Sequence, residues 1–305
     1  MEPSYDVVVI GGGPAGLTAG LYLARARVPS LLVERGIVGG QITNAERVEN
    51  YPGFPDGISG FDLGMLMHQQ ATAFSLETVF AEVTAVELDG EAKVVKTTEG
   101  DVRARAIIVA SGAAARRLGV PGEERLTGRG VSYCATCDGP LFSGQVLAVV
   151  GGGDSAVEEA LVLTRFASRV TIIHRRDQLR ASRVLQERAF AEPRLEFMWD
   201  TVVEEIAGTD RVERIRVRNV KSGERGEVEV AAIFIYVGIS PTTEYLKGLL
   251  ALDEQGSIPT DASLETEVAG IFAAGDIRQG SPRQVITAAG DGATAALSAE
   301  RYLHR

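Results

Sequence analysis

The chain has 305 residues and a formal net charge of −10. This length suits two domains, and the acidic balance argues against nucleic acid or an anionic membrane as a general partner. No apolar run approaches the roughly 18 residues that span a bilayer, and the N-terminal residues lack the basic flank and apolar stretch of a secretory signal. We therefore expect a soluble cytoplasmic protein.

The N-terminal region has a strand–turn–helix pattern. Asp6–Ile10 is apolar and rich in valine, Gly11–Gly16 is a glycine turn, and Leu17–Ala26 is an apolar, helix-like stretch. This is the order that a dinucleotide-binding βαβ unit requires. The first glycine of G-x-G-x-x-G allows a tight turn, the second lets backbone N–H groups touch a pyrophosphate, and the third lets the helix pack on the strand. The pyrophosphate would lie at the positive end of the helix.

The next strand predicts which nucleotide this unit binds. Leu31–Glu34 ends in a carboxylate 18 residues after Gly16. A carboxylate in this place can accept hydrogen bonds from an unphosphorylated ribose. The first unit is therefore expected to bind FAD.

Two later segments are predicted to belong with this first unit. Ala106–Gly112 and Gly270–Asp276 each look like a buried strand that ends in small residues or an acid. Pro282–Leu303 then reads as a helix that contains Gly290 and Gly292. Glycines inside a helix mark close contact with a neighbour, and we expect the cofactor to be that neighbour.

Cysteine occurs only at positions 134 and 137. A structural zinc site needs four ligands. The chain has no second C-x-x-C pair, and only its three histidines could supplement the two cysteines. A pair of inert buried thiols is a second alternative. A redox-active disulfide is favoured, because two cysteines at this spacing can close a small ring without backbone strain. Asp138 follows directly and is a candidate for exchanging protons with a leaving thiolate or with a reduced flavin.

The strand–turn–helix pattern then occurs a second time. Val146–Val150 leads into Gly151–Ala156, which fits G-x-G-x-x-A, and Val157–Phe166 is the helix-like stretch. The following strand, Val170–Ile173, ends in a histidine and two arginines, with a third arginine one turn further on. Guanidinium groups in this place would bind a 2′-phosphate, whereas an acid would repel it. The second unit is therefore expected to bind NADPH.

The order of these segments predicts an inserted domain. Residues 1–116 and 246–305 are expected to form a discontinuous FAD-binding domain, and residues 117–245 an NADPH-binding domain that carries the cysteine pair. Candidate crossings between them are Ala113–Pro121 and Ser240–Tyr245. Two adjacent connections favour a hinge. The predicted fold class is α/β, with two Rossmann-like dinucleotide-binding domains.

Over essentially its full length the chain resembles the bacterial low-molecular-weight thioredoxin reductases. The segments that carry this resemblance are Gly11–Gly16, Gly39–Gln41, Val48–Gly53, Cys134–Gly139, Gly151–Glu159, His174–Arg176 with Arg180, and Ala273–Asp276 with Arg283-Gln284. The resemblance implies FAD contacts at Gln41, Asn50, Asp276, Arg283 and Gln284. It also implies a homodimer and a thioredoxin-like partner protein. No metal is expected, because the chain lacks the ligands of a structural zinc site.

The predicted activity is NADPH-dependent reduction of the thioredoxin disulfide through FAD and the Cys134–Cys137 pair. The inserted domain would rotate between half-reactions, because nicotinamide and disulfide both need the same face of the flavin. Two alternatives remain: an FAD-dependent dithiol oxidase that passes electrons to oxygen, and a reductase of another thioredoxin- or glutaredoxin-like protein.

The candidate residues fall into a catalytic and a cofactor-binding set. The catalytic set is Cys134, Cys137 and Asp138. The set for the first nucleotide is Gly11, Gly13, Pro14, Ala15, Gly16, Glu34, Gly40, Gln41, Asn50, Val83, Ser111, Gly112, Gly275, Asp276, Arg283 and Gln284. The set for the second nucleotide is Gly151, Gly153, Asp154, Ser155, Ala156, His174, Arg175, Arg176 and Arg180.

Overall fold

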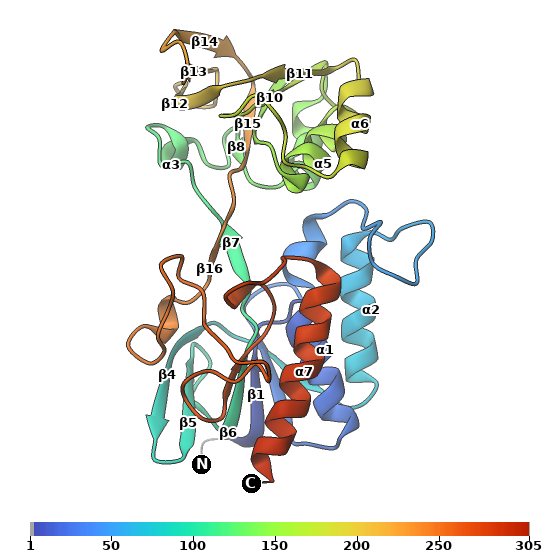
Figure 1. Ribbon diagram of the computed structural model, residues 1–305, viewed down its shortest axis with the longest axis vertical. Helices are drawn as coiled ribbons and strands as arrows, with labels where there is room; N and C mark the ends of the chain where they lie inside the picture. The colour runs from blue at the N-terminus through green and yellow to red at the C-terminus, as the bar shows by residue number, and fades with distance from the viewer. Residues whose placement is uncertain (1–2, 305) are drawn as a thin grey trace. The chain divides into compact units, whose positions relative to one another are not determined.

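In the computed structural model, which describes residues 3–304, the chain divides into two compact units (Figure 1). The first unit runs up to Ala114 and resumes at Ser240, and the second is Ala115–Ile239. The second unit is thus inserted into the first, and the predicted α/β class with two Rossmann-like units is confirmed.

The first unit contains a mixed sheet with the strand order β3-β2-β1-β6-β5-β4. The strand β5 pairs with the amino-terminal part of β6, and β17 pairs with its carboxyl-terminal part. Its strands are β1 (Ser4–Ile10), β2 (Ser30–Glu34), β3 (Glu77–Phe80), β4 (Val83–Asp89), β5 (Ala92–Thr97), β6 (Val102–Val109) and β17 (Ile271–Ala273). Its helices are α1 (Pro14–Arg25), η1 (Gly40–Asn44), α2 (Gly60–Thr72), η3 (Glu244–Leu246), η4 (Gly275–Ile277) and α7 (Val285–Leu303). The strands β1, β2, β3, β6 and β17 are parallel, whereas β4 and β5 pair antiparallel.

Both faces of this sheet are buried, which explains why β1 is apolar at consecutive positions. Val7 and Val9 pack under the helices, and Val8 and Ile10 pack into a second core on the opposite face. Figure 1 shows α1, α2 and α7 side by side on the helical face. The carboxyl ends of β1, β2 and β6 lie at one edge of the sheet, where the first glycine turn begins.

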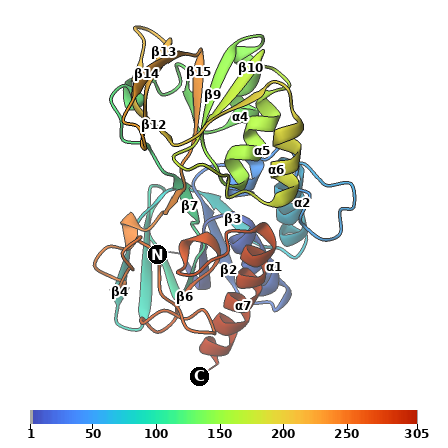
Figure 2. The same cartoon turned by 45° about the horizontal axis from the view of Figure 1, so that its top comes forward.

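The second unit is built around a parallel sheet with the order β11-β10-β9-β15-β8. Its strands are β8 (Val131–Ser132), β9 (Val146–Gly151), β10 (Arg169–Ile173), β11 (Leu195–Met198), β12 (Thr201–Ala207), β13 (Arg214–Asn219), β14 (Arg225–Glu229) and β15 (Ala232–Tyr236). Its helices are α3 (Glu123–Leu126), α4 (Ala135–Asp138), η2 (Gly139–Phe142), α5 (Asp154–Leu163) and α6 (Arg183–Ala191). One face carries α4, α5 and α6, and the other packs against the antiparallel sheet β12-β13-β14 (Figure 2).

The two connections between the units pair as a short ribbon of β7 (Ala113–Ala115) and β16 (Ile239–Pro241). The first boundary lies at Ala114, within the predicted crossing, and the second lies at Ser240, six residues before the predicted domain boundary at 246. The hydroxyl of Tyr245 contacts Ser111 Oγ at 2.8 Å, which ties the residues after Ser240 to the first unit.

The helices α1, α5 and α7 start at residues that differ from the predicted ones, for a local reason. The helices α1 and α5 begin directly after Gly13 and Gly153, three residues before the predicted starts, because each extended glycine serves as the N-cap. Conversely, α7 begins at Val285 rather than at Pro282. Arg283 has a φ of 60°, a left-handed conformation that cannot belong to a right-handed helix.

One of the two glycines inside α7, Gly292, has a different neighbour from the one expected. A Cβ at Gly292 would lie 2.0 Å from the carbonyl oxygen of Ala15, so this glycine lets α7 approach α1. A Cβ at Gly290 would meet no atom within 4 Å. The close neighbour of Gly292 is therefore a helix and not a cofactor.

This difference predicts opposite effects of alanine at the two positions. Gly292→Ala should destabilise the protein by about 1–3 kcal/mol, because the helices must separate to make room. Gly290→Ala should stabilise it by up to about 1 kcal/mol, because alanine has the higher helix propensity. Urea unfolding of the two variants measures both. Equal effects of the two substitutions would contradict the helix–helix contact.

Candidate active site

The first glycine turn joins β1 to α1 and matches the stereochemistry that the sequence predicts. Gly11 has a φ of 107°, and a Cβ there would lie 2.4 Å from the carbonyl oxygen of Ala110. A Cβ at Gly16 would lie 1.8 Å from the carbonyl oxygen of Gly11. Gly13 has open space at the position of a Cβ. The outer glycines thus permit the turn and the packing of the helix, and the middle one leaves room for a ligand at the helix N-terminus, next to Pro14.

Several predicted residues converge on this turn. The carboxylate of Glu34 accepts the backbone N–H of Gly12 at 2.6 Å, which places it beside the turn. A Cβ at Gly40 would lie 3.1 Å from the Cα of Gly13, and one at Gly275 would lie 3.0 Å from the Cβ of Ala15. Gln41 follows Gly40 within η1. Segments far apart in the sequence therefore line one cradle whose centre carries no side chain.

Other members of the first set are held by long-range contacts within the same unit. The amide of Asn50 donates to the side-chain oxygen of Gln284 at 3.0 Å. Ser111 Oγ donates to the carbonyl of Thr242 at 3.1 Å, and Gly112 has a φ of 62°. Asn50 and Gln284 are thus brought together, although 234 residues separate them in the sequence.

The remaining members of this set lie in two places: Asp276 and Arg283 follow Gly275 along the chain, and Val83 lies in β4. Asp276 lies in η4, next to Gly275, and burial raises the pKa of its carboxyl group. Ser281 contacts this carboxyl group at 3.4 Å, and the backbone of Arg283 follows shortly after. Val83 begins β4 and packs against the core on the sheet face opposite the helices.

The second glycine turn joins β9 to α5 and repeats the geometry of the first. Gly151 has a φ of 150°, and a Cβ there would lie 2.5 Å from the carbonyl oxygen of Tyr236 and 2.7 Å from the Cβ of Ala156. Gly153 has open space at the position of a Cβ. Asp154 starts α5, and Ser155 is the next residue of that helix. This turn too can accept a pyrophosphate at a helix N-terminus.

The basic cluster lies at the carboxyl end of β10, beside this turn. His174 is only 5% exposed, and a Cβ at Gly152 would lie 2.5 Å from its ring. Burial lowers the pKa of His174, and the charge of Arg180 lowers it further, so its ring is neutral at pH 7. Arg175, Arg176 and Arg180 are exposed, and within residues 3–304 no carboxylate forms an ion pair with them. The uncompensated positive charge suits an anionic ligand.

Two backbone contacts fix this cluster to the glycine turn. The N–H of Arg180 donates to the carbonyl of Gly152 at 2.6 Å. The N–H of Ser182 donates to the carboxylate of Asp154 at 2.6 Å. The segment that carries the arginines therefore keeps its place relative to the start of α5.

Cys134 and Cys137 form a disulfide across the first turn of α4. Cys137 is exposed and Cys134 is partly buried. Ser132 Oγ accepts the N–H of Cys134 at 3.1 Å and lies 3.2 Å from its carbonyl oxygen. Asp138 ends this turn, and its N–H donates to the carbonyl of Cys134 at 3.2 Å. Among residues 3–304 no group of three or more side chains that could hold a metal ion is found.

The comparison with protein families matches residues 5–292 to the family described as pyridine nucleotide-disulphide oxidoreductase. The chain belongs to this family. FAD and NADPH, the predicted cofactors, agree with this membership. Within the described residues no helix is long and apolar enough to cross a membrane.

Relatives and solved structures agree with the predicted resemblance. A thioredoxin reductase of Bacillus subtilis is 49% identical over 304 residues, covering 99% of this chain and 96% of the relative. The structure of Lactococcus lactis thioredoxin reductase in the FR conformation superposes with a TM-score of 0.97 at 48% identity, covering 98% of this chain and 99% of that one. A Streptococcus pyogenes thioredoxin reductase, also 48% identical, gives a TM-score of 0.66 and covers 100% and 99%.

Sequence reasoning missed the residues that hold the predicted ones in place. A partly buried ion pair joins Arg278 Nε to Asp291 Oδ2 at 2.5 Å, and the same carboxylate accepts the N–H of Gly275 at 3.1 Å. The hydroxyl of Tyr236, at the end of β15, accepts the N–H of Ala135 at 2.9 Å. The sequence holds one signal for Tyr236. It is the last residue of an apolar strand, and the predicted site residues Glu34 and His174 also lie at the ends of apolar strands.

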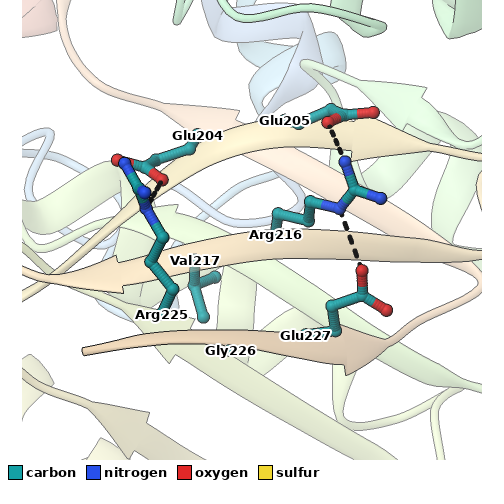
Figure 3. Close-up of a pocket in the computed structure, with 7 residues that line it drawn as sticks. All are labelled: Glu204, Glu205, Arg216, Val217, Arg225, Gly226 and Glu227. Atoms are coloured by element: carbon teal, nitrogen blue, oxygen red, sulfur yellow. Dashed lines mark hydrogen bonds and ion pairs between the residues drawn. The ribbon is translucent and has the colours of Figure 1, made fainter.

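A shallow depression on the outer sheet of the second unit is not part of this site (Figure 3). Arg216 pairs with Glu205 at 2.7 Å and with Glu227 at 2.9 Å, and Arg225 pairs with Glu204 at 2.9 Å. Each positive group already faces a carboxylate. Such exposed pairs contribute about 0–1 kcal/mol each to stability.

Proposed function

We propose that this protein is an NADPH-dependent thioredoxin reductase that reduces its partner through the Cys134–Cys137 disulfide. The observation that carries the proposal is one unit that holds both this disulfide and a dinucleotide turn flanked by three arginines, which form no ion pair within the described residues 3–304. The names of the relatives and solved structures support thioredoxin as the substrate.

The first unit is proposed to bind FAD, and the domain that binds it to be the discontinuous one. The open space at Gly13 fits a pyrophosphate at the N-terminus of α1, and the carboxylate of Glu34 has lone pairs left for the hydroxyls of a ribose. When bound, FAD supplies a carrier that takes a hydride from a nicotinamide and passes two electrons to a disulfide.

The inserted unit is proposed to bind NADPH. The open space at Gly153 would admit the pyrophosphate, and Arg175, Arg176 and Arg180 would bind the 2′-phosphate. Neutral His174 contributes no charge; its ring supports the turn at Gly152. This arrangement would select NADPH over NADH because the latter leaves the guanidinium groups without an anion.

The chemistry of the protein itself is proposed to be thiol–disulfide exchange. Two electrons and two protons convert the Cys134–Cys137 disulfide into two thiols. One of them, as a thiolate, attacks a sulfur of the thioredoxin disulfide, and the second resolves the mixed disulfide. Thioredoxin leaves with two thiols, and the internal disulfide is restored. Asp138, one residue after Cys137, is proposed to hold and deliver the proton at the leaving sulfur.

A change in the relative placement of the two units is part of the proposal. Both the disulfide and the NADPH turn belong to the inserted unit, and both must reach the same flavin. Two solved relatives with equal identity superpose with TM-scores of 0.97 and 0.66, which supports a variable placement in this family. We further propose that the protein is a homodimer, as the resemblance implies, and that it is cytoplasmic, as the sequence analysis predicts.

An engineered crosslink between the two units tests this rotation. It should abolish turnover with thioredoxin while one half-reaction survives, because a locked protein can present only one of its two groups to the flavin. Opening the crosslink chemically should restore turnover. Full turnover in the locked protein would refute the rotation.

The function itself is tested by anaerobic mixing of the purified protein with NADPH and then with oxidised thioredoxin. NADPH should remove the absorbance of oxidised flavin, and thioredoxin should restore it with formation of its dithiol. Failure of NADPH to reduce the flavin would favour the dithiol oxidase instead. Reduction of glutaredoxin-like proteins in preference to thioredoxins would favour the other alternative.

A further inference from the structure

One tyrosine links the redox disulfide to the rest of the inserted unit. Tyr236 is the last residue of β15, and it is partly buried against the core that includes residues of α4 and α5. Its hydroxyl oxygen accepts the N–H of Ala135 at 2.9 Å. Ala135 lies between the two cysteines and is 0% exposed, so water cannot replace this acceptor. A side chain 101 residues away thus satisfies a buried N–H inside the C-x-x-C turn.

The same hydroxyl stays protonated and lies within reach of an acidic charge. Burial raises the pKa of Tyr236, and the charge of Glu159 on α5 raises it further, so the phenol keeps its proton at neutral pH. Because its oxygen accepts the N–H of Ala135, the negative end of the O–H dipole points toward the C-x-x-C turn.

The backbone of Tyr236 touches the dinucleotide turn. Tyr236 pairs with Gly151 across β15 and β9, and its carbonyl oxygen would lie 2.5 Å from a Cβ at Gly151. The residue is therefore fixed by the sheet at its backbone, and its hydroxyl is bonded to the N–H of Ala135. A tyrosine placed in this way can position the cysteine turn with little freedom.

The backbone N–H groups of the cysteine turn have different acceptors, and only that of Ala135 is bonded to Tyr236. The N–H of Cys137 donates to Cys134 Sγ at 3.2 Å, and Ser132 satisfies the N–H of Cys134. The N–H of Ala135 is thus the one tied to another strand of the sheet. Asp138 and Glu159 are the acidic groups whose charges act on the tyrosine hydroxyl.

We propose that Tyr236 is a positioning residue that keeps the Cys134–Cys137 pair strongly reducing by neutralising the N–H of Ala135. A bare N–H beside a sulfur stabilises the thiolate, and a stabilised reduced form makes a dithiol a poorer electron donor. With the tyrosine oxygen in place, the thiolate gains less from this dipole. The pair then gives up its electrons more readily, which a donor to thioredoxin requires. This inference rests on the proposed function, because it concerns the same disulfide.

The test measures the equilibrium of the cysteine pair in the FAD-containing protein without NADPH or thioredoxin. The protein is equilibrated anaerobically in mixtures of reduced and oxidised glutathione, and the thiols are alkylated and counted by mass spectrometry. In the reaction, the protein disulfide and two glutathione thiols give the protein dithiol and one glutathione disulfide. Two electrons and two protons pass to the protein, so the equation balances.

Tyr236→Phe should shift this equilibrium about three- to tenfold toward the dithiol. The pH profile of cysteine alkylation should move to lower pH in the same variant, since more thiolate is present. Glu159→Gln should shift the equilibrium in the same direction, because it removes a negative charge close to the cysteine turn. If Tyr236→Phe fails to fold, the disulfide–dithiol equilibrium of Glu159→Gln tests the inference.

Tyr133→Phe is the matched control. The hydroxyl of Tyr133 also donates to a buried carboxylate, that of Glu123 at 2.6 Å, and the residue directly precedes Cys134. Its removal should lower stability without moving the equilibrium. An equal shift in the control, no shift in the two test variants, or a shift toward the disulfide would overturn the inference. If the wild-type pair never opens in glutathione, the proposed function fails with it; if it opens but the variants behave like wild type, only the inference fails.

Discussion

Replacing either cysteine with serine should lower the reduction of thioredoxin by at least about a thousandfold, a loss of about 4 kcal/mol in transition-state stabilisation. With one sulfur gone, no internal disulfide can accept the two electrons, and a hydroxyl cannot form a mixed disulfide. Reduction of the flavin by NADPH should persist, because the glycine turn and the arginine cluster lie outside the cysteine turn.

The two activities are separated by measuring flavin reduction and thioredoxin turnover on the same preparations of Cys134→Ser and Cys137→Ser. Thr136→Ser is the matched control, since it changes one of the two residues between the cysteines and leaves the disulfide intact. It should keep most of the turnover. A serine variant that still reduces thioredoxin at a rate near wild type would rule out Cys134–Cys137 as the electron carrier.

Replacing Arg175 and Arg176 with alanine should lower kcat/KM for NADPH by at least about a hundredfold, given about 1.5–3 kcal/mol for each hydrogen bond to a charged group. The value for NADH should change little, because NADH lacks the 2′-phosphate. The preference for NADPH would then largely disappear. The loss should shrink at high salt, since ions screen the exposed guanidinium groups.

Steady-state rates with both nucleotides, at low and high ionic strength, measure this effect. Arg211→Ala is the control, because Arg211 is an exposed arginine of the same unit that lies between β12 and β13. Both side chains in the test variant are exposed, so we expect its stability to stay within about 0.5 kcal/mol of wild type. Equal decreases of kcat/KM for NADPH and NADH would show that the arginines do not bind the 2′-phosphate.

Local features of the site follow directly from the sequence. Gly11 and Gly151 adopt conformations with positive φ, and the side-chain-free positions 13 and 153 face open space. Sequence can predict these because the steric rules for glycine act within a few residues. The cysteine pair is equally local, since four consecutive residues bring its sulfurs together. The insertion of one unit into the other also followed from the order of the strands.

Helix ends and the second domain boundary were predicted less well. The sequence pattern predicts starts of α1 and α5 that are three residues late, because an extended glycine followed by the first helical residue has no strong polar cap signal. The start of α7 depends on the left-handed Arg283, which no propensity predicts. The boundary at Ser240 depends on where Tyr245 makes its contacts.

By itself, the sequence determined the two nucleotide-binding turns, the redox pair and the arginine cluster, because each is built from neighbours along the chain. Only the tertiary structure decided that Asn50 meets Gln284, that Gly292 faces α1, and that Tyr236 reaches Ala135. Such contacts depend on strand order, register and helix packing. These are set by the burial of two cores on each sheet and leave no local mark on the residues that finally touch.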